Sequence, residues 1–419
     1  MKAYLETYGC TANKGDSELI LGQLVRLGWT ITNNLEEADL VIVNTCAVKG
    51  VTYRRMKSRL QELKKLGKKV LVAGCLPLID PRCLDGYSAI SCRSIPSLPE
   101  VLTKMCNGEE VKILFHPFTE KPLLPRVRLE KISAIIQIEE GCLSNCAYCS
   151  VRLARGTLKS FLPENLERIT REAVEEGAKE ILLTGQDTAV YGWDIGTDLP
   201  SLVQRLTALP GDFKIRIGMM NPTHVLKILP SLLDAYESPK VYKFLHLPVQ
   251  SGDNQVLRDM RRGYTVEDFE RIVSTFRERF PDLQLVTDVI VGFPTEDEEA
   301  FRRTFELLER VKPDKVNLSK FSPLPGTDAA RLKQLDSRVV AARSKIAAEL
   351  CQKIAMEVNR KYVGKNMRVL VVERGPRGGF LARSFNYKPV ILQEAKIGEE
   401  VEIEVIDVKP THLVGRRVK

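Results

Sequence analysis

Residues 131–150, KISAIIQIEEGCLSNCAYCS, decide the fold, because an apolar strand candidate at 133–138 runs directly into a loop with three cysteines. Cys142, Cys146 and Cys149 follow the spacing C-x3-C-x2-C. Three thiolates on one short loop can bind one face of a cubic iron-sulfur cluster. No fourth cysteine follows at ligand spacing, so one iron of such a cluster would stay open to another ligand.

A zinc site is the alternative for this cysteine loop. Structural zinc usually takes four ligands in paired Cys or Cys/His sets, and no histidine lies near these three cysteines. The spacing therefore favours the cluster over zinc.

Strand and helix patterns alternate on the carboxyl side of the loop. Helical patterns such as PENLERITREAVEEG and VEDFERIVSTFRERF separate the strand candidates, as in a series of β/α units. Six such units predict an open partial barrel. The strand candidates are SAIIQI, KEILLTG, FKIRIG, YKFLHLPV, LQLVTDVIVGF and DKVNLSKF.

A second parallel α/β domain is predicted on the amino side, from strand candidates AYLETY, DLVIVNT and KVLVAG with helical patterns between them. Cys10, Cys46 and Cys75 each come just after one of these strands. Because parallel strands end at the same edge of a sheet, we expect the three cysteines to converge there on a second cluster.

The alternative is that these cysteines are small core residues, which is common for unpaired cysteine. The other four cysteines show no regular position and receive no role: Cys83, Cys92, Cys106 and Cys351. Ten cysteines in a reducing cytosol indicate metal ligands or redox groups rather than disulfides.

The ends of these domains can be placed from composition. Residues 116–130 hold three prolines and no period, which indicates a linker or strap. Residues 338–364 predict one long helix, and residues 361–419 show short strands broken by Gly and Pro, typical of a small antiparallel barrel. The predicted parts are 1–115, an α/β domain; 116–130, a linker; 131–360, the partial barrel with its exit helix; and 361–419, the small barrel.

Composition limits the location and the partners of the 419-residue chain. It has 63 Lys and Arg against 54 Asp and Glu, and residues 361–419 hold 12 basic and 7 acidic side chains. This excess favours a polyanionic partner without proving one. No apolar run reaches the roughly 18 residues of a membrane span, and no room for a signal peptide precedes the first strand, so we expect a cytoplasmic protein without a membrane partner.

The cysteine loop, at the start of six β/α units, resembles that of the radical S-adenosylmethionine (SAM) enzymes. This resemblance implies a [4Fe-4S] cluster whose open iron binds SAM, and an electron from the cluster that cleaves SAM to a radical. Thr184-Gly185-Gln186-Asp187 resembles the turn that binds the methionyl amino group, although Gln-Asp replaces the common Gly-Glu. The SAM contacts that the resemblance implies are Tyr148, Gly185, Gln186, Asp187, Gln250, Gly292, Phe293 and Pro294.

The order of a three-cysteine α/β domain, a radical SAM domain and a basic barrel resembles the methylthiotransferases, whose last domain is the RNA-binding TRAM module. His246–Gly252, Met260–Tyr264 and Phe321–Thr327 are further family-like segments, although Leu324 replaces a common arginine in the last. Residues 183–197 and 216–222 resemble the archaeal and eukaryotic threonylcarbamoyladenosine branch, without the eukaryotic membrane tail. This branch implies modification of adenosine C2 beside the tRNA anticodon.

Two clusters in one chain lead to the hypothesis of a division of labour between these clusters and two SAM molecules, as follows. One SAM methylates sulfur at the cluster of Cys10, Cys46 and Cys75, and a second SAM, cleaved at the other cluster, yields the radical that removes the C2 hydrogen. The implied partners are the anticodon stem-loop, a ferredoxin- or flavodoxin-like electron donor and a sulfur donor.

Basic residues interleaved with aromatic ones predict the RNA contacts, because Lys and Arg neutralise phosphates while loop bases stack on aromatic rings. The predicted contacts are Arg152, Arg155, Arg374, Arg377, Arg383, Lys388, Arg416 and Arg417. Arg152 and Arg155 could instead reach SAM or the target nucleotide.

Two further alternatives stay open at this stage. A methylthiotransferase of this layout could act on another tRNA adenosine or on a ribosomal protein. A protein of another class, a non-catalytic RNA-binding protein with metal sites, would share the basic barrel and the cysteines.

Overall fold

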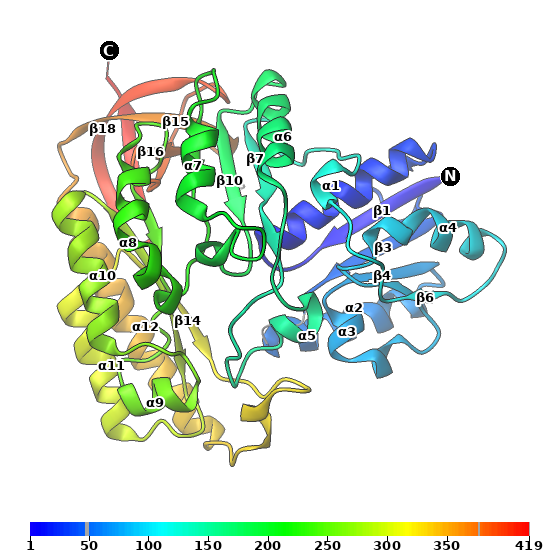
Figure 1. Cartoon of the computed structure of the whole chain (residues 1–419), viewed down its shortest axis with the longest axis horizontal. Helices are drawn as coiled ribbons and strands as arrows, with labels where there is room; N and C mark the ends of the chain where they lie inside the picture. Colours follow the sequence, from blue (N-terminus) through cyan, green and yellow to red (C-terminus); the bar gives the residue numbers. More distant parts are fainter. Residues whose placement is uncertain (47–49, 376–377, 419) are drawn as a thin grey trace.

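The computed structural model describes residues 1–46, 50–375 and 378–418. An α/β domain at the amino end lies beside a central partial barrel, and a small β-barrel at the carboxyl end lies against the other side of the central domain (Figure 1). In those described residues, no helix is long and apolar enough to cross a membrane.

The amino-terminal domain is one parallel sheet in the order β2-β1-β3-β4-β5-β6. Alternate residues of β3 face opposite layers, because Leu40 packs with α1 and α4 while Val41 packs with α2. Buried apolar residues on both faces are typical of parallel strands. Its elements are β1 Lys2–Thr7, α1 Thr11–Arg26, β2 Thr30–Ile31, β3 Leu40–Thr45, α2 Gly50–Lys65, β4 Val70–Gly74, α3 Leu76–Ile79, η1 Pro81–Leu84, β5 Ser88–Ile90, η2 Ile95–Ser97, α4 Leu98–Cys106 and β6 Lys112–Ile113.

The segment between the two α/β domains contains one 3₁₀ turn, η3 Lys121–Leu123, and packs along α1 as a strap. Val127 N–H donates to the Glu18 carbonyl oxygen at 3.0 Å. Gly22 of α1 lies so close that an added Cβ would be 2.2 Å from the carbonyl oxygen of Pro125. The strap is therefore a packed part of the fold.

The central domain has six parallel strands in chain order, β7, β10 and β11 in one sheet and β12, β13 and β14 in a second. An isolated bridge links Ile215 of the first sheet to Val241, which precedes the first strand of the second sheet. The predicted six β/α units are confirmed. The elements are β7 Ser133–Gln137, β8 Glu139–Glu140, α5 Val151–Arg155, β9 Lys159–Ser160, α6 Pro163–Glu175, β10 Glu180–Thr184, η4 Thr188–Val190, α7 Leu199–Thr207, β11 Lys214–Arg216, α8 Pro222–Glu237, β12 Phe244–His246, α9 Asn254–Asp259, α10 Val266–Arg279, β13 Gln284–Val291, α11 Glu298–Val311, β14 Lys315–Lys320, η5 Asp328–Arg331 and α12 Ser337–Arg360.

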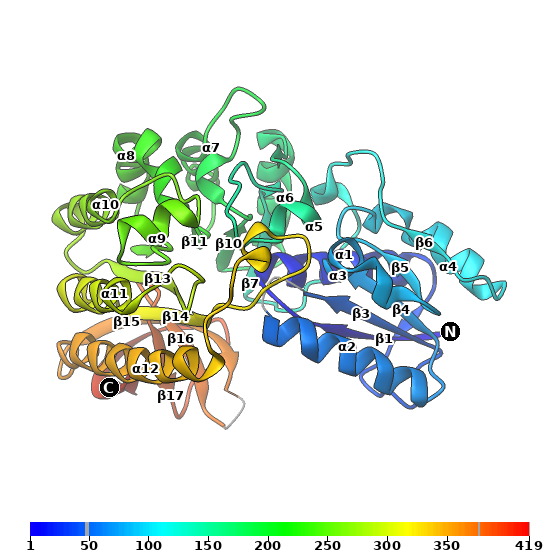
Figure 2. The same ribbon diagram turned by 90° about the horizontal axis from the view of Figure 1, so that it is seen from below.

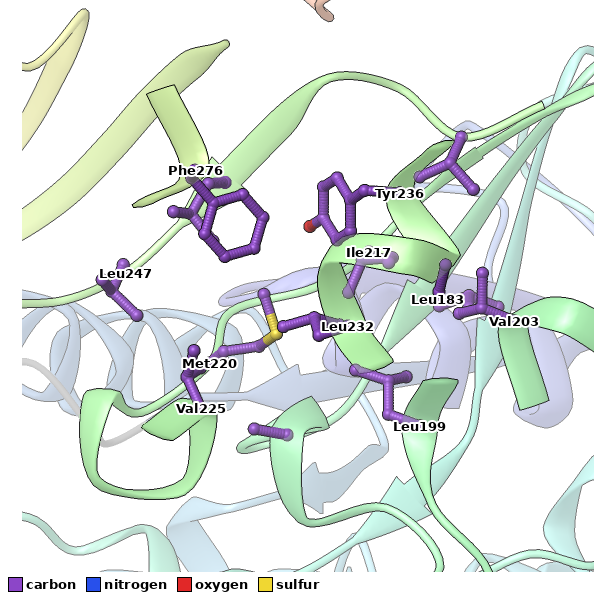
Figure 3. Packing of buried hydrophobic residues seen from close by; sticks show 14 of the residues in the cluster. Leu183, Leu199, Val203, Ile217, Met220, Val225, Leu232, Tyr236, Leu247 and Phe276 are labelled. Carbon is purple, nitrogen blue, oxygen red and sulfur yellow. The ribbon is translucent and has the colours of Figure 1, made fainter. Parts of the chain in front are cut away.

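The core of the central domain lies between its strands and the surrounding helices (Figure 2). Figure 3 shows Tyr236 of α8 and Phe276 of α10 facing each other, with ring centroids 5.2 Å apart. The Tyr236 hydroxyl donates to the Phe244 carbonyl oxygen at 2.9 Å, which satisfies the polar end of a fully buried ring. This core fixes the ends of the strands at which the predicted site residues lie.

The carboxyl-terminal strands close into a barrel in the order β15-β16-β17-β19-β18, as predicted, although β17 and β19 pair in parallel. The barrel is tied to the central domain by the buried ion pair of Lys388 with Asp314, at 2.6 Å. The ring of Tyr387 contacts Phe244, with centroids 5.0 Å apart. The strands are β15 Asn366–Arg374, β16 Phe380–Ser384, β17 Pro389–Leu392, β18 Glu400–Lys409 and β19 His412–Arg417.

Candidate active site

The cysteine loop runs from β8 to α5 and folds back on itself. Cys142 N–H donates to the Gly156 carbonyl oxygen at 3.2 Å, which joins the start of the loop to the residue after α5. Gly141 has a φ of +92°, and an added Cβ would lie 2.1 Å from the carbonyl oxygen of Thr157. Only glycine fits this turn, so the backbone fixes where the first cysteine begins.

The three loop cysteines are half-buried. Burial raises the pKa of Cys142 to about 12, with a further contribution from Asp187, and burial also raises the pKa of Cys149 to about 12. Such thiols stay protonated at neutral pH unless a cationic centre takes the thiolates. The donor set is therefore suited to a positively charged iron centre.

Two N–H groups point at the sulfurs of the loop. Ser144 N–H donates to Sγ of Cys142 at 3.4 Å, and Nη1 of Arg262 lies 3.1 Å from Sγ of Cys146. Hydrogen bonds to ligand sulfurs are a regular feature of iron-sulfur sites. Throughout the described part of the chain, no three His, Cys, Asp or Glu side chains meet closely enough to hold one metal ion. A cubic cluster takes each thiolate on a different iron, so its ligands need not meet at one point.

The predicted SAM turn lies against the cysteine loop. Oε1 of Gln186 accepts a hydrogen bond from Gly141 N–H at 2.6 Å, next to Cys142. The carboxylate of Asp187 is already occupied, because it accepts from Asn221 N–H at 2.9 Å and contacts Nδ1 of His224 at 2.6 Å. Gln186 therefore contacts the cysteine loop, whereas Asp187 binds Asn221 and His224.

Glu139 is a polar residue of this region that the sequence patterns did not single out. Its Oε1 accepts from Asp187 N–H at 2.8 Å, and its buried Oε2 has no hydrogen-bond partner. Burial raises the pKa of Glu139 well above its usual range, because the charged carboxylate is poorly solvated there. A Cβ on Gly185 would lie 2.3 Å from Oε1 of Glu139, which explains the glycine there.

Two of the predicted SAM contacts lie in one apolar cluster. Tyr148 and Phe293 both belong to it. Phe293 is fully buried against Phe321, with ring centroids 5.4 Å apart, so only the backbone of its turn can face a ligand. The adjacent Gly292 has a φ of +79°, and Pro294 is half-buried.

Gln250 lies at the end of the fourth strand segment with an unusual backbone. Its φ is +71°, and its buried Oε1 has no partner. A left-handed non-glycine residue is uncommon and costs about 1–2 kcal/mol. An unsatisfied buried oxygen at a strained position is a marker of a ligand contact.

The second cysteine set lies at one edge of the amino-terminal sheet. Cys10, Cys46 and Cys75 follow β1, β3 and β4, which are parallel neighbours. The sulfurs of Cys10 and Cys75 lie 3.7 and 3.9 Å from Oδ1 of Asn13. A Cβ on Gly9 would be 3.1 Å from the sulfur of Cys46. The expected convergence of the three side chains at this edge is therefore present, and their ligand role remains a prediction.

Cys92 occupies the same kind of position, which the sequence did not reveal. It follows the short strand β5, the parallel neighbour of β4, and its N–H donates to the Gly74 carbonyl oxygen at 2.8 Å. A hydrogen bond with Cys75 and full burial raise the pKa of the Cys92 thiol well above its usual range. The expectation that Cys92 has no regular position was wrong.

A buried ion network joins the two cysteine sites. Arg155 donates from Nη2 to Asp16 at 2.6 Å and to Asn13 at 3.0 Å, and from Nη1 to Glu140 at 3.2 Å. Lys121 of the strap pairs with Glu140 at 2.7 Å. Arg155 is 4% exposed, so it cannot bind an RNA phosphate in this arrangement. The predicted contact is instead an ion-paired residue between the domains.

A basic cavity of about 90 Å³ opens beside this network. Arg93 lies along it, with its guanidinium over the ring of Phe115 at 5.3 Å and without an ion pair in the described structure. Lys159 and His116 also line the cavity, and Glu140 is its one acidic lining residue among those described.

The other predicted RNA contacts that the structure describes differ in their exposure. Arg152, Arg374, Arg416 and Arg417 are exposed. Arg383 is half-buried, with its guanidinium 4.6 Å from the centre of the Tyr387 ring. Lys388 is 2% exposed and paired with Asp314, so it fixes the barrel rather than facing solvent. Arg377 lies outside the described residues.

Family models match three segments of the chain. Residues 136–308 match the Radical SAM superfamily, residues 2–87 match the Uncharacterized protein family UPF0004, and residues 360–418 match the TRAM domain. These three matches occur in the order expected from the sequence.

Solved structures share the fold over most of the chain. The radical S-adenosylmethionine methyltransferase TsrM from Kitasatospora setae, with cobalamin and a [4Fe-4S] cluster bound, has a TM-score of 0.59 at 14% identity, covering 78% of this chain and 77% of that chain. The cobalamin-dependent radical enzyme OxsB has a TM-score of 0.56 at 12% identity, covering 86% and 56%. At these identities the likeness concerns the fold.

Full-length relatives carry one activity in their names. The probable threonylcarbamoyladenosine tRNA methylthiotransferase of Pyrococcus horikoshii is 47% identical over 99% of both chains. The threonylcarbamoyladenosine tRNA methylthiotransferase of Xenopus laevis is 34% identical over all of this chain and 77% of its own. With this similarity along its whole length, the chain belongs to the threonylcarbamoyladenosine tRNA methylthiotransferase family, a family of radical SAM enzymes.

Proposed function

We propose that the enzyme replaces the C2 hydrogen of N6-threonylcarbamoyladenosine, beside the tRNA anticodon, with a methylthio group. One SAM would supply the methyl group for the sulfur, and a second SAM would be the source of the radical that takes the C2 hydrogen. Two [4Fe-4S] clusters take part, one bound by Cys142, Cys146 and Cys149 and one bound by Cys10, Cys46 and Cys75.

The position of Arg155 carries this proposal. Its guanidinium donates to Asn13, which lies between the sulfurs of Cys10 and Cys75, and also to Glu140, two residues before Cys142. One buried side chain thus connects both cysteine sites. A reaction that moves sulfur from one site to a carbon activated at the other needs this kind of fixed spacing.

The radical SAM domain would bind one of the two clusters and SAM, in keeping with its superfamily. When bound, these groups supply the electron transfer and the hydrogen-abstracting chemistry. The protein's residues bind and orient them. Gln186 holds the loop through Gly141, and the unpartnered Oε2 of Glu139 is available for a hydrogen bond with SAM.

Other SAM contacts follow from the apolar cluster. Tyr148 and the backbone of Gly292 and Pro294 form the adenine side of the site, and the unpartnered Oε1 of Gln250 makes a polar contact there. Phe293 supports the turn from behind, because its ring is fully buried. An apolar wall with few polar groups also excludes water from a reactive radical.

RNA binding is assigned to the exposed arginines. Arg374, Arg416 and Arg417 of the barrel and Arg152 beside the cysteine loop face solvent and can neutralise phosphates. The half-buried Arg383, stacked on Tyr387, can contact RNA only through its exposed edge. The anticodon stem-loop is the RNA partner, and the reaction further needs a ferredoxin- or flavodoxin-like electron donor and a sulfur donor in the cytoplasm.

Mass spectrometry of total tRNA nucleosides tests the proposed reaction. The chain is expressed in a host without methylthiotransferases, with Cys142→Ala as the inactive control. We expect the 2-methylthio form of threonylcarbamoyladenosine with the wild-type chain and none with the control. If tRNA is unchanged while the wild-type protein carries its iron, the substrate assignment is wrong, and a ribosomal protein becomes the next target to test.

Cys10→Ala tests the division of labour between the sites. We expect this variant to cleave SAM to 5'-deoxyadenosine but to insert no sulfur, because it retains Cys142, Cys146 and Cys149. Loss of both activities, or of neither, would contradict the assignment of sulfur chemistry to the amino-terminal site.

A further inference from the structure

Arg262 is a buried guanidinium beside the cysteine loop, and nothing above explains why a charge is buried there. It lies just after α9, whose end is joined to the loop by Ala147 N–H donating to the Met260 carbonyl oxygen at 3.1 Å. Arg262 is 6% exposed. Its Nη1 lies 3.1 Å from Sγ of Cys146, and its Nε lies 3.2 Å from the Tyr264 hydroxyl oxygen.

The charge of Arg262 has no carboxylate partner within the described parts of the chain. Its oxygen acceptor, the Tyr264 hydroxyl, is neutral and itself donates to the Val249 carbonyl oxygen at 2.7 Å. A buried, unpaired cation destabilises a fold by several kcal/mol. The contact with Sγ of Cys146 therefore places this uncompensated charge directly against a predicted cluster ligand.

We propose that Arg262 is a positioning residue for the radical SAM cluster, holding Cys146 through an N–H to sulfur bond and supplying the positive charge that favours the reduced cluster. Hydrogen bonds to cluster sulfurs and nearby charge are the levers by which a protein sets cluster potential. This inference rests on the proposed cluster at Cys142, Cys146 and Cys149.

The chain offers a matched control one residue away. Arg261 is exposed and pairs with Asp328 at 2.7 Å on the surface. The reduction potential is measured by a redox titration followed by electron paramagnetic resonance, in a Cys10→Ala/Cys46→Ala/Cys75→Ala background. We expect Arg262→Gln to shift the potential to more negative values at full iron content, with Arg261→Gln unchanged from the parent.

Thermal unfolding of the iron-free protein separates this role from a merely structural one. Without the cluster, removal of an unpaired buried charge should leave the melting temperature of Arg262→Gln equal to or above that of the parent. A potential equal to that of the parent would overturn the proposal. If Arg262→Gln cannot bind iron, Arg262→Lys decides, because it keeps the charge: it should restore iron binding with a potential close to that of the parent, and failure to restore iron would overturn the proposal. Absence of any cluster in the parent itself would instead contradict the proposed function.

The basic cavity carries a second, independent inference. Arg93 and Lys159 line it without an ion pair in the described residues, and Lys121 and Arg155 form its buried floor with Glu140. Phe115 and Phe118 are 64% and 53% exposed beside it. Gly156, which accepts from Cys142 N–H, lies against the guanidinium of Arg93, so the cavity borders the cysteine loop.

We infer that this cavity binds an oxyanion of the substrate RNA, with the exposed phenyl rings available to stack an unpaired base. Unpaired arginine and lysine beside exposed aromatic rings is the arrangement that binds single-stranded nucleic acid. Two groups of the proposed substrate share this chemistry, a backbone phosphate and the carboxylate of the threonylcarbamoyl group.

Binding of two anticodon stem-loop RNAs distinguishes them, one with adenosine and one with threonylcarbamoyladenosine at the target position. Arg93→Gln and Lys159→Gln should each weaken binding about fivefold or more, with Arg168→Gln of the exposed α6 surface as control. For a phosphate, both RNAs lose affinity and the salt slope falls by about 1. For the carboxylate, only the modified RNA loses affinity. Wild-type binding of both RNAs by both variants would refute the inference. The assay needs no turnover, so it is independent of the methylthiolation test.

Discussion

Neutralising Asp16 should destabilise the junction between the two α/β domains more than any surface substitution. Asp16 is fully buried and its carboxylate contacts Arg155 at 2.6 Å, Lys121 at 3.7 Å and the Gln137 amide at 2.9 Å. Together, the carboxylates of Asp16 and Glu140 balance the positive charges of Arg155 and Lys121. Asp16→Asn keeps the shape but leaves one cation without a counter-charge in the interior.

The size of the effect follows from that imbalance. Removing one partner of a buried ion pair costs about 3–5 kcal/mol, and because Glu140 remains, we expect about 3 kcal/mol here. Urea unfolding of the iron-free protein measures it, with Trp29 reporting on the amino-terminal domain and Trp193 on the central domain. Glu100→Gln, which neutralises an exposed pair with Lys104, is the control and should leave the transition unchanged.

The difference in stability between the wild type and Asp16→Asn should also depend on pH. Burial alone would raise the pKa of Asp16, but the charges of Arg155 and Lys121 outweigh it, so its pKa lies below the usual 3.8. A depressed carboxyl pKa stabilises the fold above the unfolded value, and this contribution is lost as the pH falls through the folded value. The wild type should exceed Asp16→Asn by a constant amount between about pH 5 and 8, and the gap should shrink below about pH 4. A gap under about 1 kcal/mol at pH 7, or one that widens in acid, would refute this reasoning.

Three further outcomes are expected. Gly9→Ala should lower the amount of iron bound by the amino-terminal cysteines, because the new methyl group would lie 2.7 Å from Cβ of Cys46, and it should leave the iron of the cysteine loop unchanged. The iron content of each site is measured separately, in Cys142→Ala and Cys10→Ala backgrounds. Equal loss of iron at both sites would contradict this prediction. Gly22→Ala should lower the melting temperature, since its Cβ would collide with the rigid carbonyl of Pro125, and an unchanged melting curve would show that the strap is not packed as described. Arg416→Gln should weaken stem-loop binding and reduce its salt slope by about 1 without a change in melting temperature; a lower melting temperature with intact binding would make it a structural residue.

Most of the architecture could be predicted from the sequence because its signals are local. Six strand candidates of the central domain are found where expected, since buried parallel strands read as short apolar runs. The convergence of Cys10, Cys46 and Cys75 was also predictable, because position after a parallel strand is a property of sequence order.

Cys92 was missed because β5 has only three residues, too few for a period to identify it as a strand. The prediction of Arg155 and Lys388 as RNA contacts failed for another reason. Their partners, Asp16 and Asp314, lie far away in sequence, and an arginine or lysine in a basic stretch looks the same whether it meets RNA or a buried carboxylate. No sequence pattern singled out Glu139, because its burial depends on how the chain packs around the end of β10.

The contacts of the strap decide at which residue two related chains can be joined into a hybrid. The Lys121 amine donates to the Cys92 carbonyl oxygen and to Glu140, so it belongs electrostatically to both α/β domains. A chimera that exchanges the first domain at residue 87, where its family match ends, would separate β5 and β6 from the sheet that they complete, and the strap from α1, against which it packs. Hybrid enzymes built from two relatives should therefore have their crossover after Arg155, which keeps Asp16, Lys121, Glu140 and Arg155 from a single parent.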